Sequence, residues 1–233
     1  VQRPFPFPDG SMIRLTVSKY YTPSGRCIQK PYQTGDGEDY QKDMLRRYEA
    51  GEFSSEDSVR FADSLRFETL RNRRPVYGGG GIMPDRFVPI DTTAYSEYYR
   101  DLVAKGILNR YCITYVDNNR KQLKADYPTE EAFISRFSVG DPMMQEIVKM
   151  GESDSIKFNQ EQFDRSRAMM ETIVKGIIGR DLFETSTYFK VVNPVLNPVF
   201  RQGLVLINDD KRYNRLLREG RKAQPVQKVE KVA

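Results

Sequence analysis

The chain has 233 residues and a formal net charge of +5, and 39% of its residues are hydrophobic. This length allows one large domain or two small ones, and the composition is typical of a polar, helix-rich protein. The sequence contains no histidine, which excludes Ser-His-Asp triads, histidine zinc sites and histidine general bases. It also contains no run of about 18 apolar residues, so it predicts no transmembrane helix.

The first 90 residues are predicted to be rich in strands and loops. Residues 5–8 are expected to be extended, because each proline disfavours helical backbone in the residue before it. Asp9-Gly10 is typical of a tight turn, and the alternation of apolar and polar residues over 12–18 predicts a half-buried strand after it. A surface helix is expected over 36–52 and a short strand over 67–70.

Four consecutive glycines occupy positions 78–81. They do not form a phosphate-binding loop, because no Lys-Ser/Thr pair follows them. A dinucleotide-binding fingerprint is disfavoured as well, because no helical pattern begins directly after them. We expect a tight loop between strands.

From residue 91 onward the pattern becomes helical, and we expect a helical domain over 91–220 followed by a flexible tail over 221–233. Prolines 194 and 198 predict a kinked or broken helical hairpin over 188–205. The first helix is expected to be capped by Asp91 or Thr92 and to be broken at Gly106. Further helices are expected to start at residues 128–131, at Asp141-Pro142 and at residues 159–162. The expected fold class is therefore α+β.

Few residues carry obvious chemistry. Cys27 and Cys112 form neither a CxxC pair nor a metal-ligand pattern, so we expect two buried free thiols, no metal and no cofactor. Ser18 and Lys19 are adjacent and would point to opposite faces of a strand, which disfavours a Ser-Lys dyad between them. Residues of this chain alone therefore predict no complete active site.

Three blocks of sequence carry a family resemblance. They are Val1-Gln2, residues 9–29 (DGSMIRLTVSKYYTPSGRCIQ) and residues 81–85 (GIMPD). In this order they resemble the later part of the C-terminal processing peptidases, the tail-specific serine proteases of peptidase family S41. The form YGGGGIMPD at 77–85 resembles envelope proteases of the Bacteroides group. The resemblance covers about residues 1–90, within which about 30–77 look like an inserted, helix-bearing excursion.

The resemblance implies a protease core in which a neutral lysine takes the proton of a nucleophilic serine. Gln2 matches the family's glutamine that orients this lysine through its side-chain amide. The lysine and the serine are then expected upstream of Val1, together with a PDZ module that recognises substrates. The parent protein is expected to cleave proteins near their C-termini in the periplasm or cell envelope, and this fragment alone is expected to be inactive.

The helical domain leaves several interpretations open. A supporting or dimerising role, with homo-oligomers formed through this domain, is favoured over a cap that limits access to the protease. A different class of function is a noncatalytic interaction module that binds an acidic protein through basic residues over 212–222. Nucleic-acid binding is disfavoured, because no recognition motif accompanies the charge.

Overall fold

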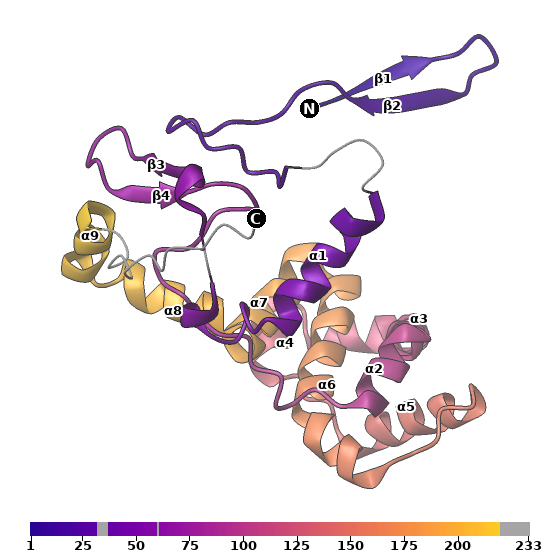
Figure 1. Cartoon of the computed structure of the whole chain (residues 1–233). Coiled ribbons are helices and arrows are strands. Elements are labelled where there is room, and N and C mark those ends of the chain that lie inside the picture. Colours follow the sequence, from indigo (N-terminus) through magenta and orange to yellow (C-terminus); the bar gives the residue numbers. More distant parts are fainter. Residues whose placement is uncertain (32–36, 60, 220–233) are drawn as a thin grey trace. The chain divides into compact units, whose positions relative to one another are not determined.

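A computed structural model describes residues 1–31, 37–59 and 61–219 (Figure 1). The chain divides into two compact units, one of Val1–Ile90 with the segment from Leu206 onward and one of Asp91–Val205. A few short strands precede a mostly helical region, so the predicted α+β class is confirmed. The helical unit ends at Val205, whereas the expected helical domain extended to residue 220, and the expected tail lies outside the described residues.

The N-terminal hairpin forms as predicted. Strand β1 (Gln2–Pro6) pairs antiparallel with β2 (Met12–Thr16). Gly10 has φ +84°, and the Asp9 carboxylate accepts a hydrogen bond of 2.9 Å from the Ser11 amide. This left-handed backbone is the conformation that a glycine adopts without steric cost.

The burial predicted for the second strand is wrong. Residues Ile13, Leu15 and Val17 share one face of the hairpin and are 45%, 51% and 54% exposed. Phe5 pairs with Ile13 on this face and is 40% exposed. We call these four side chains the hairpin face. Alternation correctly predicted a strand, but in the described residues no element covers its apolar side.

The same unit contains helix α1 (Gly37–Glu49) and a second hairpin of β3 (Arg66–Glu68) and β4 (Pro75–Tyr77). The predicted surface helix and short strand are thus confirmed. Helix α9 (Asp210–Glu219) ends at the turn between β3 and β4, where the Leu217 carbonyl accepts a hydrogen bond of 2.8 Å from Asn72 Nδ2. The glycines at 78–81 follow β4, but no strand follows them within residues 82–90.

Helix α6 is the centre of the helical unit (Figure 1), and it contacts α2, α3, α4, α5 and α7. Gly176 and Gly179 lie on α6, and a methyl group at either position would come within 2.9 Å of side chains packed against it. These glycines therefore allow α7 to approach α6 closely. The helices of this region are α2 (Glu97–Ala104), α3 (Ile107–Asp126), α4 (Glu130–Arg136), α5 (Asp141–Ser153), α6 (Gln160–Leu182), α7 (Thr185–Leu196) and α8 (Pro198–Ile207).

The first helix of this unit begins later than predicted. The expected cap was Asp91 or Thr92, but α2 starts at Glu97 and Ser96 caps it, with its hydroxyl accepting a hydrogen bond from the Tyr99 amide. The Asp91 carboxylate instead accepts hydrogen bonds from the amide and hydroxyl of Thr93 and forms a local turn. The predicted break between α7 and α8 is confirmed at residue 197.

The two cysteines are both free, as predicted, but differ in burial. Cys112 is buried in the core of the helical unit, whereas Cys27 is only half-buried, so the prediction of two buried thiols holds for one of them. In the described part of the chain, no helix has the length and apolar character needed to cross a membrane.

Candidate functional site

Gln2 lies at the start of β1 and is exposed. It pairs with Thr16 across the hairpin. Because side chains alternate along a strand, Gln2 and Thr16 are on the face opposite to Phe5 and Ile13. The carboxamide is therefore presented on the polar side of the hairpin, and its role in orienting a lysine stays a prediction.

The second and third blocks of the resemblance lie side by side. The Gly81 amide donates a hydrogen bond of 2.8 Å to the Ile28 carbonyl, and the Gly79 amide donates one of 3.4 Å to the Cys27 carbonyl. Gly79 and Gly81 both have positive φ, at +89° and +97°. The glycines thus let the backbone after β4 run along the Cys27–Ile28 segment.

The inserted segment of about residues 30–77 begins and ends at neighbouring positions in the structure. The Phe67 ring on β3 packs against Gly25 and Gly78, one residue on each side of the junction. Arg74, also within the excursion, forms an ion pair of 2.5 Å with Asp85 of the third block. The excursion therefore also contacts the residues that it separates in sequence.

The adjacent Ser18 and Lys19 lie exposed at the end of the first hairpin, where the Ser18 carbonyl accepts a hydrogen bond of 2.6 Å from the Val1 amino group. A lysine that serves as a general base is usually desolvated in an apolar pocket. The exposure of Lys19 provides no such setting. This geometry supports the interpretation that the pair is not a catalytic dyad.

Among residues 1–31, 37–59 and 61–219, no cluster of three or more histidine, cysteine or carboxylate side chains is placed to hold a metal ion. Burial raises the pKa of the Cys112 thiol to about 12. Because the thiolate is the nucleophilic form, this residue is not suited to nucleophilic chemistry.

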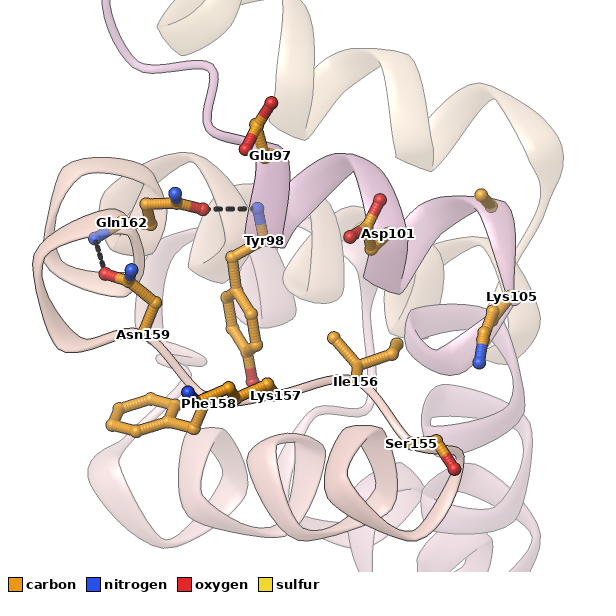
Figure 2. A pocket seen from close by; sticks show the side chains of 11 residues that line it. Glu97, Tyr98, Asp101, Lys105, Ser155, Ile156, Lys157, Phe158, Asn159 and Gln162 are labelled. Atoms are coloured by element: carbon orange, nitrogen blue, oxygen red, sulfur yellow. Dashed lines mark hydrogen bonds between the residues drawn. The ribbon is translucent and has the colours of Figure 1, made fainter.

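The helical unit contains a cavity that the sequence did not reveal. It has a volume of about 420 Å³ and lies between α2 and the segment Ser155–Asn159 that leads into α6 (Figure 2). Its α2 wall includes Tyr98 and Asp101, and Gln162 lies at the start of α6. The capping pattern at 159–162 was visible in the sequence, but nothing there indicated that it faces α2.

Comparisons with known protein families match two separate parts of the chain. The model described as peptidase family S41 matches residues 1–38, and the model of a family of unknown function (DUF8443) matches residues 98–184. No curated protein and no solved structure matches the chain. The first match includes Gln2 and both strands of the first hairpin, and it supports a peptidase origin for this segment.

Proposed function

We propose that the chain is the C-terminal portion of a tail-specific serine endopeptidase of family S41. The observation that supports this most is the family match over residues 1–38, which coincides with the hairpin that carries Gln2. The contact between residues 27–28 and 79–81 adds support, because it brings together two blocks that the resemblance places in one protease core.

The exposed hairpin face is consistent with a chain that is part of a larger protease. A two-stranded hairpin is marginally stable alone and needs an apolar partner surface. Phe5, Ile13, Leu15 and Val17 are each at least 40% exposed. In the proposed enzyme, residues of the protease core upstream of Val1 cover this face, and a PDZ module further upstream binds the substrate.

The proposed reaction is peptide bond hydrolysis by a serine and a lysine that both lie upstream of Val1. The neutral lysine takes the serine proton, the serine oxygen attacks the peptide carbonyl, and the lysine then donates the proton to the leaving amine. Water hydrolyses the acyl-enzyme and restores the serine. Gln2 is the positioning residue, because its side-chain oxygen accepts a hydrogen bond from the lysine. The proposed location is the periplasm or cell envelope.

The test compares this 233-residue chain with a longer polypeptide that includes the residues encoded before Val1. We expect the longer protein to cleave an unstructured peptide and to react with a fluorophosphonate probe, and the shorter chain to do neither. Gln2→Ala should lower kcat of the longer protein about tenfold or more, because one hydrogen bond to a catalytic group is lost. Thr16→Ala, at the cross-strand position, should leave kcat unchanged.

Two outcomes would refute parts of this proposal. Cleavage by the 233-residue chain that is lost in Ser18→Ala would restore the adjacent Ser18-Lys19 pair as the catalytic dyad. A longer polypeptide that contains no reactive serine would exclude the protease function as a whole.

For the helical unit we propose a supporting role with self-association. Phe189 and Val195 on α7 and Val199 and Val205 on α8 are between 52% and 60% exposed. The Arg201 guanidinium on α8 donates hydrogen bonds to the carbonyls of Pro194 and Val195 at the end of α7. This cationic group is therefore engaged within the helical unit. If light scattering shows a dimer, Val199→Glu should dissociate it, whereas Val103→Glu on α2 should not.

The second candidate function is a noncatalytic module that binds an acidic protein. The basic residues Lys211, Arg215 and Arg218 are exposed on α9, which supports this alternative. Of the other basic residues in the predicted cluster, Arg212 is half-buried on α9, and Arg221 and Lys222 lie outside the described residues. Arg215→Glu should abolish salt-sensitive binding to such a partner, and unchanged binding would exclude this surface.

A further inference from the structure

The cavity beside α2 offers hydrogen-bond donors from one wall. Gln162 Oε1 accepts a hydrogen bond of 2.7 Å from the Tyr98 amide, and Asn159 Oδ1 accepts one of 3.0 Å from the Gln162 amide (Figure 2). A carboxamide whose oxygen is held in this way keeps its NH2 group as a donor. Asn159 and Gln162 both line the cavity, so their amino groups can serve a ligand there.

The opposite wall offers acceptors. Glu97 and Asp101 are one helical turn apart on α2, and both line the cavity. Arg100 is their neighbour on the same helix, with its guanidinium 3.0 Å from Asp101 and 3.8 Å from Glu97. The Arg100 side chain is 58% exposed, and such exposed ion pairs contribute little free energy. A cation of a ligand can therefore replace Arg100 at low cost.

Two lysines line the same cavity but differ in availability. Lys105 Nζ donates a hydrogen bond to the Asp154 carbonyl, so its ammonium group is used within the protein. Lys157 is exposed and belongs to the same segment as Asn159, so it adds a third donor to that wall. Donors and acceptors therefore lie on different walls, which suits a ligand that carries both kinds of group.

Between the two walls lies an apolar surface. Its accessible part is the half-buried Phe158, whose ring meets the Tyr98 ring edge to face with the centroids 5.7 Å apart, while Tyr98 and Ile156 are 2% and 5% exposed and support it from within the core. The Tyr98 hydroxyl is buried and has no hydrogen-bond partner among the described residues. Buried hydroxyls are nearly always bonded, so this hydroxyl is an unusual feature of the core directly behind the cavity.

We propose that this cavity binds a short peptide segment that carries an arginine or lysine side chain. Backbone carbonyls of the segment accept hydrogen bonds from Asn159, Gln162 and Lys157. The aliphatic part of the side chain lies on the apolar surface, and its cationic head pairs with Asp101 and Glu97. The cavity belongs to the helical unit, so this inference is independent of the protease proposal.

The test uses the full 233-residue chain, isotope-labelled for amide NMR, and the blocked peptide acetyl-Gly-Ala-Arg-Ala-Gly-amide. We expect saturable shifts of the amide signals of Tyr98, Phe158 and Gln162. The same peptide with citrulline in place of arginine keeps the shape but lacks the charge. It should bind about two- to fivefold more weakly, because it loses an ion pair with half-exposed carboxylates that contributes at most about 1 kcal/mol.

A matched pair of variants tests whether the Asp101 carboxylate binds the cationic group of the peptide. Asp101→Asn should weaken binding of the arginine peptide about two- to fivefold, because an ion pair with a half-exposed carboxylate contributes at most about 1 kcal/mol. Asp117→Asn removes an exposed carboxylate that also contacts an arginine, on α3 and away from the cavity, and should leave binding unchanged. Equal binding of the two peptides, no effect of Asp101→Asn, or no saturable shift around the cavity would overturn the proposal. The amide spectrum of each variant shows that it is folded.

Discussion

The Ser166 hydroxyl on α6 lies 2.7 Å from the Ser96 hydroxyl that caps α2, and both side chains are buried. Ser166 also lies within hydrogen-bond distance of the Ala94 carbonyl, at 2.7 Å. The central helix of the unit therefore holds the residues immediately before α2 and at its cap. This contact explains why α2 begins at Glu97 rather than near Asp91.

Removing this hydroxyl should destabilise the protein. Ser166→Ala is expected to lower the free energy of unfolding by about 1–3 kcal/mol, because buried polar groups of Ser96 and Ala94 lose a partner. Tyr98→Phe is the matched control, since the Tyr98 hydroxyl is buried without a partner, and it should leave the free energy unchanged or raise it. Urea unfolding followed by circular dichroism measures both. Equal losses in the two variants would contradict the assigned hydrogen bonds.

The close packing of α7 on α6 should depend on Gly176. In Gly176→Ala the new methyl carbon would lie 2.9 Å from atoms of Tyr188 and Val192. We expect the free energy of unfolding to fall by about 1–2 kcal/mol, because overpacking exceeds the gain in helix propensity. Gly203→Ala on α8 meets no atom within 4 Å and should be neutral or stabilising. Thermal unfolding compares the two, and a stabilised Gly176→Ala variant would exclude close packing here.

The helical unit should lose stability at alkaline pH. Burial raises the pKa of the Cys112 thiol from 9.0 to about 12, and the pKa of the Tyr98 and Tyr99 hydroxyls from 10.0 to about 12. The unfolded chain releases these protons at lower pH than the folded one. The stability that the protonated groups contribute is therefore complete below about pH 9 and is lost as the pH rises toward 12. Melting temperatures measured across this range should fall, and Tyr98→Phe should fall less steeply.

The two thiols should differ in reactivity. Cys112 is fully buried and Cys27 is half-buried. Alkylation of the native protein near pH 8 is therefore expected to modify Cys27 and to reach Cys112 only after denaturant is added. Mass spectrometry of the digested protein distinguishes the two sites. Rapid modification of Cys112 without denaturant would show that the core around α3 opens readily.

Local sequence patterns predicted where helices and strands form, but they did not predict which side chains of those elements are buried. The alternation over 12–18 and the Asp9-Gly10 turn were sufficient for the first hairpin, because both act over a few residues. The same alternation could not show that Ile13 and Leu15 are exposed, because burial depends on what lies opposite them. Likewise, Asp91, Thr92 and Ser96 are all good capping residues in sequence, and the contact with Ser166 selects Ser96.

The candidate sites differ in the same way, because a local motif can be seen in the sequence whereas a contact between distant residues cannot. Gln2 could be proposed because a family motif is a local pattern, and the family match over residues 1–38 supports the resemblance, while the role of Gln2 stays a prediction. The cavity was missed because Asp101 and Gln162 are far apart in sequence and meet only when α6 packs against α2. The apposition of residues 27–28 and 79–81 was equally hidden, since backbone hydrogen bonds leave no side-chain signature.

The contact between Ile28 and Gly81 determines how freely the segment between them can change in length. A loop whose two ends are already held together can change length at a cost of only about 0.6 kcal/mol per doubling. Because Gly81 and Ile28 are joined by a backbone hydrogen bond, the intervening segment can be shortened to a turn or exchanged for another folded piece without moving its flanks. At this junction whole elements can therefore be gained or lost while the hydrogen bond between Ile28 and Gly81 is kept.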